Sequence, residues 1–463
     1  MTTGIVLPSR EAPIVRGATT VIGGPVGGHA RIGERRFWTP LRVVLALTAL
    51  TFSLGYFQKA PCRTHPWAHG YQNSRMCYSD VFALYYAEGI NEHKTPYVDH
   101  PVEYPVVIGG LMWAAGQVVK TPQAFFDVTA VMMGLAALVA AATVVVCAGR
   151  RRPWDAAMFA VSLALFFHGL TNWDLAAVAF TGLGLASWAR RRPATAGVWW
   201  GLGIATKLYP VFFAVPLAAL CWRARRMRAF LVAAVATVIT WAAVNLPVFI
   251  AAREGWARFY VLSRNRGANW ESLWYILEKV RGKSLDPRGG VSHLNLAVTI
   301  AFVLLLGGVL FLAFAAPRRP RLAPLLFLTL ASFVIVNKVY SPQYVIWLTP
   351  FAVLARPRWR AFLVWQAAEA AQLFFQFYFF LRLNDPNTGL PLSWFQTASF
   401  VRYLALIAYM GLVVRDIWRP EHDVVRSEGV DDPAGGVLTD APDAIDDEVP
   451  APAPRPVFGA APG

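Results

Sequence analysis

Residues 76–105 read MCYSDVFALYYAEGINEHKTPYVDHPVEYP, a polar, aromatic and acidic stretch that lies between two strongly apolar segments. Most of the remaining sequence up to residue 420 has the composition of hydrophobic helices. Because a polar loop of this length is unusual in such an apolar chain, we expect it to carry the chemistry. Asp80 is the first candidate within it for a reacting side chain.

The composition of the chain indicates a membrane protein. Of its 463 residues, 56% are hydrophobic and only 15% are charged, whereas about a quarter of the residues of a soluble domain are charged. Apolar segments of about 20 residues can cross the hydrocarbon core of a bilayer. We therefore predict an all-α, polytopic transmembrane protein of the plasma membrane.

The net charge of +16 does not indicate a nucleic-acid-binding protein. The arginines fall in short clusters between apolar segments, which is typical of cytoplasmic loops. Nucleic-acid binding would instead need a basic face on a soluble module, and the sequence contains no such module.

The arginine clusters also predict the topology. Arg35 and Arg36 precede the first apolar segment, so the N-terminus is expected in the cytoplasm and the long loop 58–104 outside it. If the other clusters are also cytoplasmic, about 12 crossings result, with both termini inside and 105–119 as an incomplete crossing. The apolar segments are about 38–57, 105–119, 123–148, 154–170, 173–189, 195–206, 208–222, 229–251, 293–316, 322–337, 343–355, 361–380 and 396–414.

This topology places several polar stretches on the outer side of the membrane. We expect them to converge on one face and to form an extracytoplasmic active site. They are 58–104, 168–174, 206–210, 252–292 and 337–344, with a further short loop at 382–395.

The two ends of the chain differ in composition from the membrane domain at 37–419. Residues 1–36 are rich in glycine and lack the pattern of a cleavable signal peptide, so we expect a flexible cytoplasmic tail. Residues 420–463 are rich in Asp, Glu, Pro and Ala with few aromatic residues. This composition predicts a disordered acidic tail, also in the cytoplasm.

Asp80 follows Tyr78 and Ser79 and precedes a helical pattern at 81–90. A carboxylate is ionised at neutral pH and is able to act as a general base. It is equally suited to cap the helix by accepting hydrogen bonds from backbone N–H groups. Glu103 and Tyr104, before the next apolar segment, could face the same cavity or could lie in solvent at the membrane interface.

Lys207 lies inside an apolar run, GIATKLYPVFF, and Pro210 predicts a helix break beside it. Because a buried ammonium is costly in lipid, such a residue usually faces a cavity or a partner, and an anionic lipid phosphate would suit it. Alternatively, the side chain extends to the headgroups at the membrane surface. His168, Asn172 and Asp174 flank a tight turn, where Asp174 could cap a helix or position a lysine or a sugar.

Two further polar stretches contain candidate binding residues. Arg264 and Arg266 lie near several aromatic residues, which suits either a phosphate with a stacked sugar or the anchoring of the loop to lipid headgroups. The sequence NKVYSPQY supplies Lys338, Tyr340 and Gln343 for the same cavity.

The four cysteines divide into two pairs by position. Cys62 and Cys77 both lie in the first polar loop and could form a disulfide if that loop is outside the cytoplasm, or could remain two free thiols. Cysteine and histidine spacings give no zinc site, and no phosphate-binding glycine motif is present. We therefore expect neither a metal nor a nucleotide cofactor.

Four stretches carry a resemblance to a known family: EYPVVIGG, NWDLAAVAF, ATKLYPVFFAVPL and VYSPQYVIWLTPF. Together with the YSD of the first loop, they resemble the GT-C superfamily of membrane glycosyltransferases, and within it glycosyltransferase family 87. That family includes actinobacterial polyprenyl-phosphate-mannose-dependent α-mannosyltransferases. The resemblance covers residues 38–415, but Val106 stands where many members have a second proline after Tyr104–Pro105.

The resemblance implies an inverting glycosyltransferase that acts without a metal at the outer face of the membrane. Asp80 matches the catalytic aspartate of the first outer loop in GT-C enzymes. The donor would be a sugar, mannose first among the candidates, on a polyprenyl phosphate. The acceptor would be a glycolipid or a glycan of the cell envelope, and cations such as Lys207, Arg264, Arg266 or Lys338 would stabilise the leaving phosphate.

Two other hypotheses remain open. A flippase or transporter of a lipid-linked sugar would also need charges within the membrane, although it would favour internal repeats, and none is evident. A catalytically inactive scaffold is the third hypothesis.

Overall fold

The computed structural model describes residues 37–65, 70–287, 289–426 and 431–443. Within these ranges the chain consists of α-helices and short 3-10 helices without a β-strand, which confirms the predicted all-α class. The N-terminal tail predicted for residues 1–36 lies outside the described residues.

Five helices have both the length and the apolar composition needed to cross a membrane. They contain 24 to 27 residues, and at a rise of 1.5 Å per residue they are roughly 36–40 Å long. Large apolar side chains such as Val238 and Leu304 are more than half exposed on them, which suits contact with lipid tails. The five helices are α2 (Pro40–Thr64), α6 (Pro122–Ala148), α12 (Met227–Ala251), α15 (Ser292–Ala315) and α19 (Leu392–Trp418).

The predicted number of about 12 crossings is not confirmed by these helices. Many of the other apolar segments form helices too short to cross alone, such as α5 (Val106–Gln117) with 12 residues. In contrast, α18 (Trp359–Asn384) is long but carries Glu369 and Arg382. The other helices are α3 (Tyr71–Ser74), α4 (Asp80–Ala87), α7 (Ala157–Ala160), α8 (Leu163–His168), α9 (Asp174–Ala189), α10 (Pro193–Thr206), α11 (Ala214–Arg223), α13 (Arg253–Asn265), α14 (Leu273–Arg281), α16 (Leu322–Val336) and α17 (Val345–Ala355).

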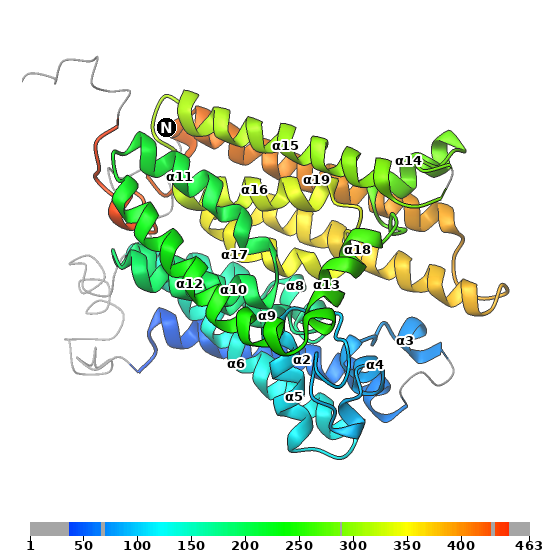
Figure 1. The fold of residues 1–463 in the computed structure, drawn as a ribbon. Helices are drawn as coiled ribbons and strands as arrows, with labels where there is room; N and C mark the ends of the chain where they lie inside the picture. Colours follow the sequence, from blue (N-terminus) through cyan, green and yellow to red (C-terminus); the bar gives the residue numbers. More distant parts are fainter. Residues whose placement is uncertain (1–36, 66–69, 288, 427–430, 444–463) are drawn as a thin grey trace, which may run out of the picture. The chain divides into compact units, whose positions relative to one another are not determined.

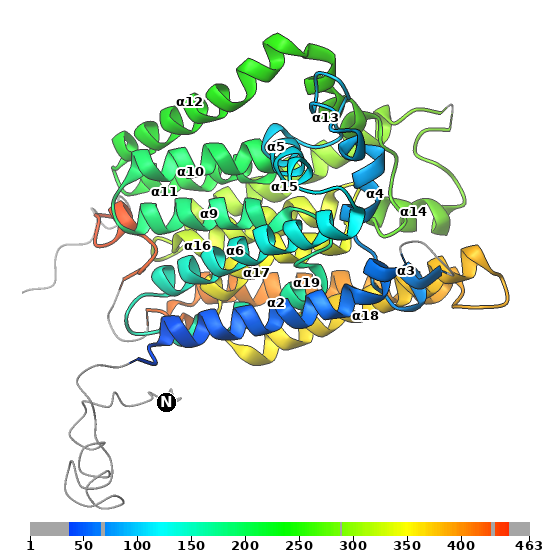
Figure 2. The same cartoon turned by 90° about the horizontal axis from the view of Figure 1, so that it is seen from below.

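The most apolar of the short helices form the core. Every residue of α17 is buried, and so is every residue of α16 except Phe333. In both Figure 1 and Figure 2 these two helices run through the middle of the helical domain. Because a helix that is apolar on all sides has no face for water, burial in the protein interior is its expected position.

Helix α10 approaches α12 closely through two glycines. A Cβ atom at Gly197 or Gly201 would collide with the backbone carbonyls of Ala233 and Thr237. These glycines are four residues apart and lie on one face of α10, which is the spacing that brings membrane helices together. Close packing here fixes the end of α10, where Lys207 follows.

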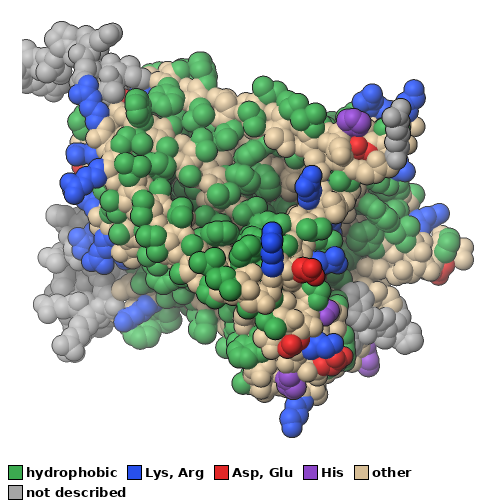
Figure 3. All heavy atoms as spheres, in the orientation of Figure 1, with side chains coloured by type: hydrophobic (Ala, Val, Ile, Leu, Met, Phe, Trp, Pro, Cys, Tyr) green, Lys and Arg blue, Asp and Glu red, His purple; other side chains and the backbone are tan. Residues whose placement is uncertain are grey.

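The central helices have one basic end and one polar end. Helices α9, α10 and α16 each have arginines at or next to one terminus, and at the other terminus they meet Asp174, Lys207 and Asn337. We call the first the arginine end and the second the polar end. Figure 3 shows lysines and arginines at one end, hydrophobic side chains along the helices, and acidic, basic and histidine side chains mixed at the other end.

A C-terminal segment, residues 431–443, packs across the arginine end. We call it the C-terminal strap, and it is the red segment beside α11 in Figure 1. The Arg223 guanidinium, which is 1% exposed, donates two hydrogen bonds of 2.6 and 2.8 Å to Asp443. The Arg319 side chain donates to the carbonyls of Leu438, Ala441 and Pro442.

The strap also ties the ends of other helices together. The Asp432 carboxylate accepts a hydrogen bond of 3.0 Å from the backbone N–H of Leu322, at the start of α16. Trp188, in the last turn of α9, donates its indole N–H to the carbonyl of Gly435 at 2.8 Å. The strap therefore joins α9, α11 and α16, which are distant in sequence.

Disorder is predicted for residues 420–463, whereas residues 420–426 and 431–443 of that stretch have defined contacts with the helices. Asp443 is paired with the buried Arg223, and Asp432 accepts the backbone N–H of Leu322, so these two carboxylates stabilise a fixed conformation. Composition alone could not reveal these partners, because they lie more than 100 residues earlier in the chain. Residues 444–463 lie outside the described residues.

We predict that Asp443→Ala lowers the stability of the protein by about 3 kcal/mol, because it leaves the Arg223 charge buried without its partner. The measurement is thermal unfolding of the purified protein in detergent. Asp440→Asn is the matched control, since Asp440 is an exposed residue of the same strap. Equal unfolding midpoints for Asp443→Ala and the wild type would contradict the structural role of the strap.

Candidate functional site

The polar end encloses a cavity of about 770 Å³. All five polar stretches expected at the outer face contribute side chains to its wall, and so does the last turn of α18. Its polar lining residues are Lys59, Gln72, Asn73, Tyr78, Asp80, Glu103, Tyr104, His168, Thr171, Asn172, Lys207, Tyr209, Ser263, Arg266, Asn269, Glu271, Asn337, Ser341, Gln343, Tyr344, Gln376 and Asn384.

The start of α4 places Asp80 in this cavity. Ser79 caps the helix, since its hydroxyl accepts a hydrogen bond from the Val81 N–H and donates one to the carbonyl of Leu170. Asp80 is the first residue of the helix, and its own N–H donates to Thr171 at 2.8 Å. Because Ser79 provides the cap, the capping alternative for Asp80 is excluded and its carboxylate is left for other partners.

Three side chains donate hydrogen bonds to the Asp80 carboxylate. The Tyr78 hydroxyl lies 2.6 Å from Oδ1, and the Tyr104 hydroxyl and the Asn172 amide each lie 3.3 Å from Oδ2. All three donors are neutral, so they orient the carboxylate without neutralising it. Asp80 therefore combines a fixed position with a negative charge facing the cavity.

Burial raises the pKa of Asp80 above its ordinary value of 3.8. The hydrogen bonds from Tyr78 and Asn172 and the positive charge of Lys207 act in the opposite direction. A buried carboxylate with such donors retains basicity toward a hydroxyl group that approaches it. The electrostatic setting therefore suits proton abstraction.

Glu103 contributes a second acid to the cavity. Its pKa is raised, first by burial and then by the neighbouring charge of Asp80. Its backbone N–H donates at 3.3 Å to Glu88, whose own pKa is raised to about 7, mainly by burial. The loop that carries Glu103 and Tyr104 is thus fixed to α4 on the side away from the cavity.

Lys207 projects into the cavity where α10 ends. The backbone is extended at Lys207, and a new 3-10 helix that contains Pro210 begins at Tyr209, so the helix break predicted from the sequence is present. The Lys207 ammonium forms an ion pair of 3.0 Å with the buried Asp174 and lies 4.6 Å from the centre of the Tyr104 ring. Asp174 therefore acts as the positioning residue for Lys207.

Tyr104 lies between the Asp80 carboxylate and the Lys207 ammonium and contacts both. Its hydroxyl contacts Asp80 and its ring contacts Lys207. The Lys207 ammonium also lies 6.0 Å from the centre of the Trp347 ring. Aromatic faces stabilise a cation without removing its charge, so Lys207 remains able to attract an anion.

Arg266 is the second cation of this wall and follows the end of α13. Its side chain is exposed, and no carboxylate of the described residues lies within ion-pair distance of it. Asn269, Gln343 and His168 line the same cavity. Arg266 is therefore free to take an anionic ligand.

Most of the candidate residues from the sequence line the cavity, but four do not. Asp174 contributes only through its ion pair with Lys207, and the other three lie away from the cavity. The Lys338 ammonium donates to the carbonyl of Arg264 and to Asn295, and the Arg264 side chain is exposed outside the cavity. Tyr340 is completely buried and donates its hydroxyl to Glu369 at 2.7 Å. Lys338 and Tyr340 thus hold the loop in place from behind, and their predicted contact with a substrate has no support in the geometry.

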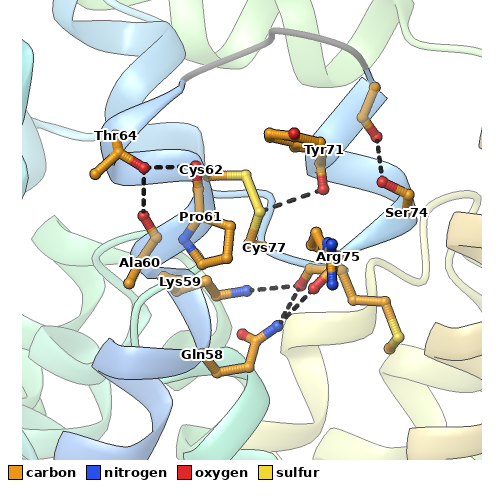
Figure 4. Close-up of a disulfide and its surroundings, with 12 residues drawn as sticks. Gln58, Lys59, Ala60, Pro61, Cys62, Thr64, Tyr71, Ser74, Arg75 and Cys77 are labelled. Carbon is orange, nitrogen blue, oxygen red and sulfur yellow. Dashed lines mark hydrogen bonds between the residues drawn. A yellow bond between two sulfur atoms is a disulfide. The ribbon is translucent and has the colours of Figure 1, made fainter.

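The disulfide between Cys62 and Cys77 joins the end of α2 to the segment just before Asp80, with Cα atoms 5.6 Å apart. Figure 4 shows Gln58 and Lys59 beside it, pointing toward the backbone of the same segment. The Gln58 amide donates to the carbonyls of Arg75 and Met76. These contacts fix the segment from both sides and thereby fix the position of α4.

Several lining residues were not among the candidates from the sequence. Tyr78 lies two residues before Asp80, and Lys59 lies within the last two turns of the first apolar helix. A charged residue inside an apolar helix is a functional candidate by default, so the position of Lys59 in the sequence was a signal that could have identified it. Gln72 and Asn73 carry no comparable signal, because they lie on a short polar helix.

Within the described part of the chain, no group of three or more His, Cys, Asp or Glu side chains is arranged to hold a metal ion.

Comparison with known proteins gives one family match. No curated protein matches the chain. The family model of glycosyltransferase family 87 matches residues 111–337, a segment that begins after Asp80 and includes Asn172, Lys207 and Arg266. This match confirms the resemblance to glycosyltransferase family 87 found in the sequence and supports a glycosyltransferase.

Proposed function

We propose that the chain transfers a sugar, with mannose as the first candidate, from a polyprenyl-phosphate donor to a membrane glycolipid or an envelope glycan. The observation that carries the proposal is the presence of the Asp80 carboxylate and the Lys207 ammonium in one cavity, connected through Tyr104. A base and a cation on the same cavity wall suit a reaction in which a hydroxyl is deprotonated while a phosphate leaves.

In this mechanism Asp80 is the catalytic base. It takes the proton of an acceptor hydroxyl, and the resulting oxygen nucleophile forms a bond to the anomeric carbon of the donor sugar. The bond between that carbon and the phosphate oxygen breaks on the opposite face, so the configuration inverts. The hydrogen bonds from Tyr78 and Asn172 keep the carboxylate oriented through the reaction.

Lys207 and Arg266 stabilise the leaving group. The electron pair of the broken bond remains on the phosphate, whose negative charge increases in the transition state. Cations positioned beside the phosphate before the reaction stabilise such charge as it develops. Asp174 fixes the position of Lys207, so little reorganisation is needed when the charge develops.

We further propose that the cavity opens to the outer face of the plasma membrane. Arginines concentrate at the opposite end of α9, α10 and α16, and such clusters favour the cytoplasmic side. In this orientation both termini lie in the cytoplasm. A lipid-linked donor would reach the cavity from the outer leaflet.

We predict that Asp80→Asn lowers sugar transfer by about 10²- to 10⁴-fold, the range expected for loss of a general base. The measurement supplies membranes with radiolabelled polyprenyl-phosphate-mannose and a native lipid extract. Asp99→Asn, an exposed residue of the same loop, is the control and retains wild-type activity.

Two outcomes of this assay contradict the proposal. Transfer by a folded Asp80→Asn variant within tenfold of the wild type would remove Asp80 from the mechanism. Movement of the labelled lipid across the membrane by the wild type, without transfer of its sugar, would favour the flippase hypothesis.

We predict that Tyr78→Phe shifts the acidic limb of the pH–rate profile to higher pH. The hydrogen bond from Tyr78 lowers the pKa of Asp80, so its loss raises that pKa and protonates the base earlier as the pH falls. The expected shift is roughly one pH unit for one hydrogen bond to a charged group. Tyr86→Phe, an exposed tyrosine of α4, is the control, and identical profiles for both variants would contradict this role.

We predict that Lys207→Gln lowers kcat/KM for the donor by about 10²-fold or more, because the leaving phosphate loses a preorganised cation. Lys338→Gln is the matched control, since Lys338 is a largely buried lysine that contacts backbone and Asn295 outside the cavity. The kinetics are measured at varied donor concentration. An equal loss in both variants would show that the effect does not depend on the cavity.

A further inference from the structure

One wall of the cavity has no part in the mechanism described so far. It consists of Lys59 on α2, Gln72 and Asn73 on α3, and Gln376 on α18, and we call it the α2–α3 wall. Figure 2 shows α3 beside α18, whereas α13, which leads to Arg266, lies on the other side of α4. The cavity therefore continues past Asp80 beyond the space that a donor phosphate needs at Lys207 and Arg266.

Lys59 is a buried lysine without an acidic partner among the described residues. It is 2% exposed, and within the same residues its side-chain nitrogen makes one long contact of 3.4 Å, to the carbonyl of Met76. No carboxylate of the described residues lies within ion-pair distance, although the charge of Asp80 acts on it from farther away. Since a buried charge is costly without compensation, an anion supplied by a ligand would complete this site.

The neighbouring amides also have hydrogen-bonding capacity to offer. The buried Oε1 of Gln72 has no hydrogen-bond partner among the described residues. Gln376 accepts a hydrogen bond from Gln372 through Oε1, which leaves its own N–H groups for the cavity. Amides both donate and accept, so they suit the hydroxyl groups of a sugar or another polyol.

The donor and the acceptor cannot occupy the same place. Lys207, which Asp174 already pairs, faces Tyr104 and Trp347. Lys59 belongs to the α2–α3 wall. Tyr78 and Phe377 also line the cavity, and the centres of their rings are 6.3 Å apart. Asp80 contacts both Tyr78 and Tyr104, so a hydroxyl held at the α2–α3 wall would be within its reach.

We infer that the α2–α3 wall is the acceptor subsite, and that Lys59 makes it selective for a hydroxyl-rich headgroup that carries a negative charge. This inference rests on the proposed function. Lys59 binds the anionic group, Gln72, Asn73 and Gln376 bind hydroxyls, and Asp80 receives the proton of the reacting one. Lys59 is thus a specificity-determining residue, separate from the cations that hold the donor.

The test measures how well two matched probes inhibit sugar transfer to acceptors in the native lipid extract. The probes are octyl α-mannoside and octyl α-mannoside 6-phosphate, which differ only in the charged phosphate group. For the wild type we expect the phosphorylated probe to inhibit at least tenfold more strongly, in competition with the acceptor. For Lys59→Gln we expect this preference to disappear while KM for the donor is unchanged, and for Lys59→Arg we expect it to be retained.

A second variant guards against misfolding of Lys59→Gln. Asn73→Asp adds a negative charge to the same wall with almost no change in shape, and we expect it to abolish the preference as well. Thermal unfolding in detergent checks that both variants fold.

Four results would overturn the inference. They are equal inhibition by both probes in the wild type, a preference that survives Lys59→Gln, a rise in donor KM in that variant, and a shift of its pH–rate profile without a change in probe inhibition. The last two would assign Lys59 to the donor or to Asp80. If the wild type transfers no sugar to the extract, the proposed function itself fails, which is a separate and recognisable outcome.

Discussion

The structure depends on the requirement that backbone and side-chain polar groups be satisfied inside an apolar environment. Helices α8, α10 and α16 all end inside the protein, and their broken ends would be costly in contact with lipid. They end around one cavity, where polar side chains are available as partners. The Ser79 hydroxyl, for example, bonds to the carbonyl of Leu170 just after α8. The same requirement that ends the helices therefore also brings the polar residues of distant segments together.

The two ends of these helices differ in how their charged side chains are paired. At the arginine end, buried guanidinium groups are paired, as Arg223 is with Asp443 and Arg321 with Asp423. These pairs stabilise a fixed arrangement and leave little capacity for a ligand. At the polar end, Lys207 has a partner in Asp174, whereas Lys59 and Arg266 have no carboxylate within ion-pair distance among the described residues. Unpaired cations next to a cavity are the feature that separates a binding site from a structural ion-pair network.

Similar residues have different roles according to whether their side chains face the cavity or lie behind its wall. Lys207 and Lys338 both follow an apolar helix within a short polar stretch, and both are largely shielded from solvent. Lys207 enters the cavity because the chain is extended at the end of α10 and turns at Pro210. Lys338 turns instead toward the carbonyl of Arg264, where it joins two loops. Tyr340 likewise faces Glu369 and the guanidinium of Arg402, behind the same wall.

The sequence by itself determined the all-α membrane class, the polar stretches that meet at the cavity, and the candidacy of Asp80, Lys207 and Asp174. It could do so because hydrophobicity, helix-breaking prolines and isolated charges act locally along the chain. Only the tertiary structure decided that Ser79 rather than Asp80 caps α4, that Lys59 faces the cavity, and that residues 431–443 pack against Arg223 and Arg319. These outcomes depend on which distant segments become neighbours. The local sequence of an acidic segment does not show whether arginines lie beside it, and the local sequence of a lysine does not show whether it faces a cavity. The physical environment of these residues is therefore set by the tertiary structure.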